Sequence, residues 1–264
     1  MLAKGPDETG AAIADDLREL GFDYIELSLA QIAVLPEPDY QVLCRRVRES
    51  GIRSEACNNF FPPSLRLTGP EYDPSRIMAY ARPAMERAAR LGVEIIVFGS
   101  GPAKRVPTGF SMSTAWSQLV ELTGQLAITA MDLGLNIAIE PLRREECNII
   151  NSAAEGLSLV RATATESVKL LVDFYHLCAE GESCKILAEA GDRICHIHLA
   201  KPEGRRFPVQ ADSNLYQEFF DALIDIEYEG RISVEAYSDD FRNDAAASLA
   251  FLRQAFVERK APSY

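Results

Sequence analysis

Short apolar runs alternate along the chain with longer amphipathic stretches, and this alternation is its most regular feature. The short runs are rich in β-branched residues and have the length of strands. Strands are expected at residues 23–29, 51–57, 93–100, 135–140, 168–174, 194–200 and 231–237. Helices are expected between them at residues 9–20, 38–50, 74–91, 112–133, 152–163, 183–190, 213–226 and 242–258.

Strict alternation of strands and helices predicts a parallel sheet. If Met1–Lys4 forms a short first strand, the count is that of a (β/α)₈ TIM barrel, in a single domain spanning residues 1–264. A doubly wound sheet is the alternative. However, no GxGxxG motif follows the first expected strand, and the glycine-rich "GSGPAK" at 99–104 comes later, where a turn explains it.

Polar side chains fall at the C-terminal ends of the last four expected strands. They are Glu140, Asp173, His198 and Glu235. Because the C-terminal ends of barrel strands all face one mouth, where active sites lie, these side chains should converge. Three carboxylates and one imidazole form an oxygen-rich ligand set, which suits Mn²⁺, Mg²⁺ or Co²⁺ better than a structural zinc ion. The pattern therefore predicts one divalent metal ion.

Each of these residues has a simpler explanation when it is taken alone. Asp173 could be a helix N-cap or a surface charge, and His196 or His198 could be a hydrogen-bonded core residue. The two histidines lie two positions apart, so both rings should face the barrel interior. We expect His198 to be the ligand nearer the mouth and His196 to lie one layer deeper. Four polar residues on four consecutive strand ends favour a shared site over independent explanations.

The composition narrows the choice of partners. The formal net charge of −12 argues against nucleic acid and anionic membrane surfaces as partners and favours a small ligand that is neutral or brings a cation. No apolar run reaches the roughly 18 residues that a membrane span needs. The six cysteines form no CxxC pair, and the N-terminal sequence has no signal-peptide pattern, so a reducing cytoplasmic compartment is expected.

Four segments carry a resemblance to a known family. "IEPLRREECN", "VDFYH", "HIHLA" and "ISVEAY" occur in that order. They resemble the sugar isomerase/epimerase superfamily of xylose-isomerase-like TIM barrels, and most of all the ketose 3-epimerases of the D-tagatose and D-psicose 3-epimerase type. The segment "VFGSGPAKRVPTGF" at 97–110 is similar to the fourth-strand loop of many bacterial members.

The resemblance implies a metal-dependent isomerase that acts on a small sugar. Its metal ligands would be the same four residues, with Mn²⁺ favoured over Mg²⁺ and Co²⁺. Glu140 and Glu235 would also exchange the proton of the carbon beside a ketose carbonyl, by way of a cis-enediolate whose charge the divalent ion stabilises. This exchange on opposite faces would invert that carbon.

The resemblance also implies contacts to the rest of the substrate. Glu146 and His176 match positions that contact sugar hydroxyls. Arg205 or Arg206 would take the place of an arginine that follows the histidine of the "HIHLA" segment, although the Pro-Gly-x-Gly that usually comes next is absent from "KPEGRRFPVQ". A homodimer or homotetramer is a further expectation.

Other functions remain open from the sequence. Within the superfamily they are hydroxypyruvate isomerase, an inosose dehydratase relative and a metal-dependent C-glycoside deglycosidase subunit. Outside enzymes, the alternative is a non-catalytic barrel that binds a sugar. An endonuclease IV relative is disfavoured because three histidines in the whole chain are too few for its three-metal cluster.

Overall fold

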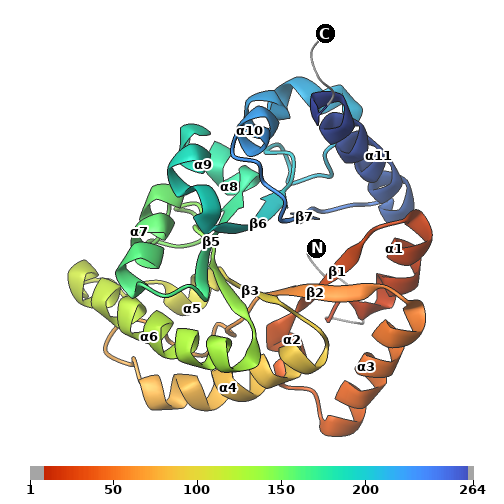
Figure 1. Ribbon diagram of the computed structural model, residues 1–264. Helices are drawn as coiled ribbons and strands as arrows, with labels where there is room; N and C mark the ends of the chain where they lie inside the picture. The colour runs from red at the N-terminus through yellow and green to blue at the C-terminus, as the bar shows by residue number, and fades with distance from the viewer. Residues whose placement is uncertain (1–8, 261–264) are drawn as a thin grey trace.

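The computed structural model describes residues 9–260 and the side chains of residues 9–256. Its strands lie side by side in chain order as one parallel sheet, curled into a ring with the helices outside (Figure 1). The strands are β1 (Tyr24–Ser28), β2 (Arg53–Asn58), β3 (Ile95–Phe98), β4 (Asn136–Ile139), β5 (Val168–Asp173), β6 (Ile194–Leu199) and β7 (Arg231–Val234). This sequential order confirms the TIM-barrel prediction and is not that of a doubly wound sheet, whose order reverses at a switch point.

Helices follow the strands and cover the outside of the ring. They are α1 (Ala14–Leu20), α2 (Leu29–Ala33), α3 (Glu37–Ser50), α4 (Pro74–Arg90), α5 (Gly101–Lys104), α6 (Met112–Leu133), α7 (Ala153–Thr163), α8 (Phe174–Ala179), α9 (Lys185–Ala190), α10 (Ser213–Asp225) and α11 (Phe241–Lys260). Short 3₁₀ turns lie at Ala11–Ile13, Gly191–Arg193 and Gln210–Asp212. The longer helices begin and end as the sequence predicts. In α6, Ser111 accepts the backbone N–H of Thr114, and Gly134 ends the helix in the left-handed region at φ 68°.

Three short helices were not expected from the sequence. They are α2, α5 and α8, and each begins immediately after or within three residues of a strand. Their four to six residues are too short to show a hydrophobic period of 3.6, so the pattern along the chain cannot reveal them.

Side chains alternate along the strands between two separate cores. The outward-facing apolar residues pack under the helices in one large cluster. The inward-facing ones form a small cluster on the barrel axis, made of Ala56, Ile95, Val97, Ala138 and Leu171. Because strand side chains repeat every two residues, the next inward position along each strand lies nearer the mouth. The next inward residues after Ala56, Ala138 and Leu171 are polar, and they contribute to the candidate site.

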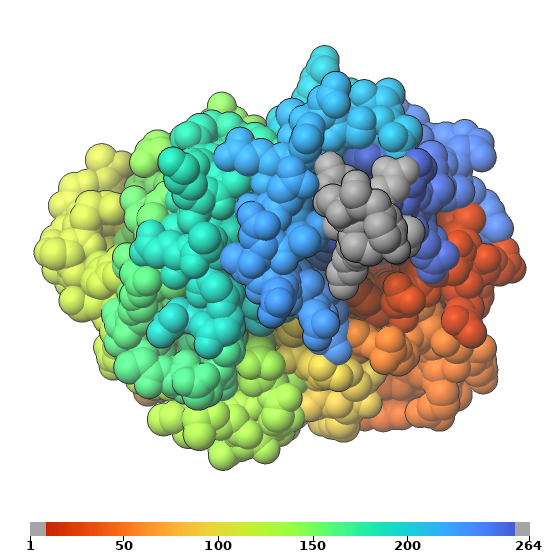
Figure 2. All heavy atoms as spheres, turned by 45° about the horizontal axis from the view of Figure 1, so that its top comes forward, coloured from red at the N-terminus to blue at the C-terminus, as the bar shows by residue number. Residues whose placement is uncertain are grey.

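The two ends of the sheet, β1 and β7, face each other. No ladder joins them within residues 9–260, but the Tyr24 hydroxyl lies 2.8 Å from the Ser233 hydroxyl across the seam. Outside the seam, α1 lies against α11, so that the red and blue ends of the described chain meet (Figure 2). There Arg242 pairs with Asp16 and Glu19.

A largely apolar cavity of about 620 Å³ lies along this seam, with Leu17, Phe22 and Leu252 among its lining residues. The place between β1 and β7 is the one that an eighth strand takes in a closed barrel. The short first strand expected at Met1–Lys4 lies outside the described residues.

Candidate metal centre

The structure brings the four predicted ligands together at the barrel mouth. Asp173 ends β5 and His198 lies in β6, while Glu140 and Glu235 each follow the last residue of a strand, β4 and β7. All four are buried, and one ligand atom from each lies within 4.8 Å of the others. The Nδ1 atom of His198 is 3.2 Å from Oε1 of Glu140 and 3.4 Å from Oε2 of Glu235.

Glu140 and Glu235 were expected inside strands, but each lies one residue beyond the observed end of its strand, β4 or β7. Both side chains nevertheless continue the inward-facing row of their strand. Two residues before Glu140, Ala138 packs in the inner cluster, and two residues before Glu235, Ser233 contacts the buried Glu26. Space for the Glu140 carboxylate comes from Gly99, the residue after β3, where a Cβ atom would overlap Oε2 of Glu140 and lie 3.1 Å from its Cδ.

Asp173 serves as a helix cap and a member of the cluster at once. Its Oδ1 accepts the backbone N–H of Tyr175 at 2.8 Å and caps α8, while Oδ2 faces Arg205 at 3.3 Å and His176 at 3.5 Å. The cap fixes the carboxylate, which leaves the second oxygen aimed at the cluster. The helix-cap explanation of this residue is therefore confirmed, and the same carboxylate also lies in the cluster.

Arg205 enters the cluster and Arg206 does not. The guanidinium of Arg205 is buried, contacts Oε2 of Glu235 and Oδ2 of Asp173, and lies 3.9 Å from Glu146. Its backbone is in the left-handed region at φ 50°, which turns the loop so that the side chain points inward. Arg206 is half exposed and pairs with Asp239 at 2.8 Å.

The charges shift the acidities of the cluster in opposite directions. Burial raises the pKa of Asp173 to about 6, despite the opposing effect of Arg205. Burial also acts to raise the pKa of Glu235, but Arg205 and His198 outweigh it and hold that pKa below its usual range. Glu235 shifts the other way because it receives the closer guanidinium contact and the His198 ring as well.

Glu146 and His176 flank the cluster on the side of the loop after β4. Glu146 is partly exposed and accepts Arg143 Nε at 2.8 Å. His176 is buried, and its Nδ1 accepts the backbone N–H of Arg143 at 3.3 Å, while its Nε2 has no hydrogen-bond partner among the described residues. Burial lowers the pKa of His176, so the ring is neutral. With Nδ1 accepting, Nε2 carries the proton and can donate it to a ligand.

Three polar residues of the site were missed from the sequence. Lys104 is buried and donates to the backbone carbonyl of Glu140 at 3.0 Å, and Asn58 donates to Oε1 of Glu235 at 3.3 Å. Glu26 lies in β1 against the two histidines of β6. Glu26 had a sequence signal, since it is a charged residue in the apolar run "YIELSL". Lys104 lies in the four-residue helix α5 and Asn58 at the end of β2, where polar residues are common.

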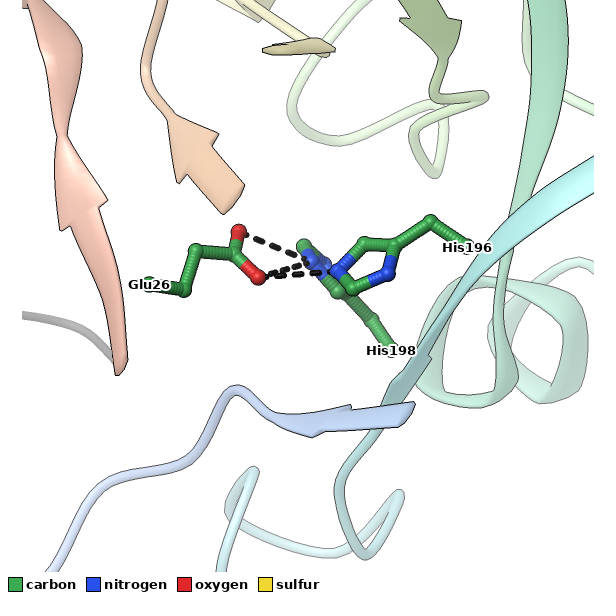
Figure 3. A group of neighbouring side chains, drawn as sticks. All are labelled: Glu26, His196 and His198. Atoms are coloured by element: carbon green, nitrogen blue, oxygen red, sulfur yellow. Dashed lines mark hydrogen bonds and ion pairs between the residues drawn. The ribbon is translucent and has the colours of Figure 1, made fainter. Parts of the chain in front are cut away.

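Glu26, His196 and His198 form a second buried group (Figure 3). The Glu26 carboxylate lies 2.9 Å from Nε2 of His196 and 3.0 Å from Nε2 of His198. The two rings meet edge to face, with centroids 5.0 Å apart. Of the two histidines, His198 reaches the carboxylates of Glu140 and Glu235, while His196 hydrogen-bonds to Glu26 and Ser233.

The donor set fits a divalent cation. Glu140, Asp173 and Glu235 bring three carboxylates into one buried space. Arg205 is the cation that contacts Asp173 and Glu235, and no lysine or arginine among the described side chains pairs with the Glu140 carboxylate. Buried carboxylates of this kind are costly without a compensating cation. Oxygen-rich ligation with one imidazole is a ligand set that can hold a divalent metal ion.

A parallel barrel with such a cluster at its mouth defines a class of proteins that can hold a divalent cation against a small polar molecule. The chain belongs to the xylose isomerase-like TIM barrel family, whose profile matches residues 14–255. This confirms the family resemblance carried by the four sequence segments.

The relatives with curated descriptions are mainly ketose 3-epimerases. The chain is 26% identical over 230 residues to the D-psicose 3-epimerase of Agrobacterium fabrum, covering 84% of this chain and 78% of that protein. It is 26% identical over 271 residues to a probable ketose 3-epimerase of Synechocystis, covering 92% and 90%. A crystal structure of D-psicose 3-epimerase in the presence of D-fructose superposes with a TM-score of 0.81 at 22% identity, covering 94% and 93%. That structural likeness supports the fold. No helix in residues 9–260 has the length and apolarity to cross a bilayer.

Proposed function

We propose that this protein is a divalent-metal-dependent ketose 3-epimerase, which inverts the carbon beside the carbonyl of a small sugar. The observation that carries the proposal is the buried group of Glu140, Asp173, His198 and Glu235 at the mouth of a barrel whose relatives are described as ketose 3-epimerases. A divalent ion held there, with Mn²⁺ the favoured choice, would polarise the carbonyl and stabilise the charge that develops when the neighbouring C–H is broken.

Two carboxylates would exchange the proton in this proposal. Glu140 and Glu235 come from β4 and β7 and approach the His198 ring from different strands, with oxygens 3.2 and 3.4 Å from Nδ1. One would take the proton from the substrate carbon and the other would return a proton on the opposite face. Inversion needs this pair of groups on two sides of the substrate.

The surrounding residues would bind and orient the sugar. His176 has a protonated Nε2 that makes no hydrogen bond within the described residues and lies 3.5 Å from Asp173, so it would donate to a hydroxyl, and Glu146 has a partly exposed carboxylate to accept one. Arg205 already lies between the cluster and Glu146, so we assign it, in place of Arg206, the contact to the remainder of the substrate. Arg143 holds the Glu146 side chain in position through its Nε donor.

The proposal is tested by incubating a panel of ketoses with the purified protein and Mn²⁺ in D₂O. The expected result is epimerisation at C3 with deuterium incorporated at that carbon, lost on chelation with EDTA and restored by Mn²⁺. Epimerisation without any solvent exchange, or no turnover of any ketose by metal-loaded protein, would contradict it. Hydroxypyruvate and inosose substrates in the same panel test the other superfamily activities, and sugar binding without turnover would indicate a non-catalytic barrel.

The roles of the two carboxylates are tested with Glu140→Gln and Glu235→Gln. Each variant keeps an oxygen that can ligate but loses the group that carries a proton, so turnover should fall by at least about a hundredfold. Glu145→Gln is the matched control, because Glu145 is exposed and pairs with Arg143 on the surface. Metal content is measured alongside. Near wild-type turnover in both metal-loaded variants would move the proton transfer to other groups, Glu146 and His176 first.

The cellular compartment and the oligomeric state of the protein are two further predictions. All six cysteines are free thiols, which accords with the proposed reducing cytoplasmic compartment. A homodimer or homotetramer is proposed from the family resemblance, and light scattering of the purified protein tests it.

A further inference from the structure

His198 presents its two ring nitrogens to two different sets of carboxylates. Nδ1 faces Glu140 and Glu235 at the barrel mouth, and Nε2 faces Glu26 at 3.0 Å. A neutral imidazole carries one proton, and the hydrogen bond made by one nitrogen decides which nitrogen keeps a lone pair. The partner of Nε2 therefore decides whether Nδ1 can bind a cation.

We propose that Glu26 is a positioning residue of the metal centre: its carboxylate holds the proton of His198 on Nε2 and so turns the Nδ1 lone pair toward Glu140 and Glu235. The inference rests on the metal site of the proposed function and adds to it a residue that does not touch the metal. Histidine ligands of metal sites commonly have such an outer carboxylate, which fixes the ring and strengthens it as a ligand.

Glu26 is itself held from several sides. The Ser233 hydroxyl of β7 donates to Oε2 of Glu26 at 2.6 Å, and the Tyr24 hydroxyl in turn lies 2.8 Å from Ser233. Glu26 is buried, so solvent water does not compete with these donors for its carboxylate oxygens. The carboxylate is thus fixed in place between β1, β6 and β7 before any metal binds (Figure 3).

His196 supports the same arrangement. Its Nδ1 has no hydrogen-bond partner among residues 9–260, whereas its Nε2 lies 2.9 Å from Oε2 of Glu26. A neutral His196 ring therefore keeps its proton on Nε2, where Glu26 accepts it. The Glu26 carboxylate then accepts from His196, His198 and Ser233, and all its contacts are to donors.

The opposite tautomer of His198 would be unfavourable on its Nε2 side. An Nε2 lone pair would face the Glu26 carboxylate, with no proton between the two acceptors. With the proton on Nε2, the lone pair of Nδ1 instead faces Oε1 of Glu140 and Oε2 of Glu235, and a cation between these three atoms resolves that contact. The contact of Nε2 with Glu26 thus leaves the Nδ1 lone pair available to a cation.

The group of Glu26, His196 and His198 could itself be taken for a second metal site, since its ligand atoms are close together. An ion there would have to displace the ring protons that Glu26 accepts, and it would occupy the Nε2 of His198. The proposal therefore expects one ion for each chain, and two bound ions would contradict it.

The test compares Mn²⁺ affinity in Glu26→Gln with that of the wild type, by calorimetric titration of metal-stripped protein. Glutamine keeps the shape but replaces the anionic acceptor, so the dissociation constant should rise about 10- to 100-fold. Ser233→Ala removes one donor that holds Glu26 and should give a smaller rise. The matched control is Glu55→Gln, because Glu55 is equally buried but pairs with Arg53 and Arg231, and its Mn²⁺ affinity should not change.

A second measurement needs no variant and decides the matter even if Glu26→Gln fails to fold. The chain has three histidines, so protein labelled with ¹⁵N-histidine gives three rings to assign. With diamagnetic Mg²⁺ bound, His198 should show a protonated Nε2 and a metal-bound Nδ1. A metal-bound Nε2, or a proton on Nδ1, would overturn the proposal.

The outcomes separate this inference from the proposed function. If the wild type binds no divalent ion, both fail. If the wild type binds one ion and is an epimerase, but Glu26→Gln binds Mn²⁺ as tightly as the Glu55→Gln control, then the inference alone is wrong.

Discussion

Replacing Gly99 by alanine tests the metal centre through a single methyl group. Gly99 follows the last residue of β3 and lies against Glu140, and a Cβ atom there would overlap the Oε2 atom of Glu140 and lie 3.1 Å from its Cδ. The backbone of Gly99 is not in the left-handed region, so alanine meets no conformational penalty of its own. The strain therefore falls on the Glu140 carboxylate.

The size of the effect follows from contact distances. Non-bonded heavy atoms keep about 3 to 3.5 Å apart, so the carboxylate has to retreat by about 1 Å or more. The backbone of Glu140 cannot follow freely, because its carbonyl accepts the Lys104 ammonium at 3.0 Å. A misplacement of about 1 Å in a catalytic group costs on the order of a hundredfold in rate. Gly99→Ala should therefore lower turnover about a hundredfold and weaken Mn²⁺ binding as well.

The assay measures Mn²⁺ affinity by titration, ketose epimerisation with saturating Mn²⁺, and thermal unfolding followed by circular dichroism. Gly124→Ala is the matched control. Gly124 lies inside α6, and no described atom lies within 4 Å of an added Cβ. That variant should leave metal binding unchanged and stabilise the fold by roughly 0.5 to 1 kcal/mol, the helix preference of alanine over glycine.

Two results would refute the reasoning. The first is wild-type Mn²⁺ affinity and turnover in Gly99→Ala, which would mean that Glu140 is not needed where the structure places it. The second is an equal loss in Gly124→Ala, which would mean that any glycine replacement disturbs the barrel.

Further predictions concern the charges of the site and the buried thiols. Arg205→Ala leaves the buried carboxylates of Asp173 and Glu235 without their cation, so the metal-free protein should lose about 3 to 5 kcal/mol of stability, and Mn²⁺ should raise its melting temperature more than that of the wild type. Arg206→Ala, which removes a half-exposed pair with Asp239, should match the wild type in both measurements, and equal behaviour of the two variants would contradict the assignment. Burial raises the pKa of Cys195 to about 12 and also raises that of the fully buried Cys57, so the unfolded chain releases these protons from about pH 9 while the native state keeps them. The contribution of these two thiols to the free energy of unfolding is complete below pH 9. It declines as the pH rises toward 12, by up to about 1.4 kcal/mol per pH unit for each thiol. Urea unfolding between pH 8 and 11 measures this decline, which should be weaker in Cys57→Ala than in the wild type.

Much of the fold was predictable because the strands of a barrel are short, apolar and regularly spaced. The runs around Ile95 to Phe98 and Val168 to Asp173 gave strands close to those observed. The four predicted ligands could be chosen because each lies at or within one residue of the C-terminal end of a strand, and parallel strand ends converge. The family resemblance adds to this, but the convergence itself follows from strand order.

The rest of the site depends on contacts that no local pattern encodes. Glu26 was overlooked because its partners, His196 and His198, lie in β6, about 170 residues later in the chain. Lys104 lies in a helix of four residues, and its role appears only when its side chain reaches the Glu140 carbonyl. The choice between Arg205 and Arg206 required the backbone direction of the loop, which adjacent arginines in a sequence do not reveal.

The seam between β1 and β7 has a consequence for the order of folding. Within residues 9–260, each ladder joins strands that follow one another in the sequence, as Tyr24 with Arg53 or Ile137 with Val168. The contact of Tyr24 with Ser233 instead spans 209 residues, a roughly sevenfold longer loop, whose closure costs about 1.7 kcal/mol more in chain entropy. Neighbouring strands can therefore pair one after another as local events, and the meeting of the two sheet edges comes last. Since Ser233 and Glu26 lie on opposite sides of that seam, the metal centre reaches its final form only when this last contact is made.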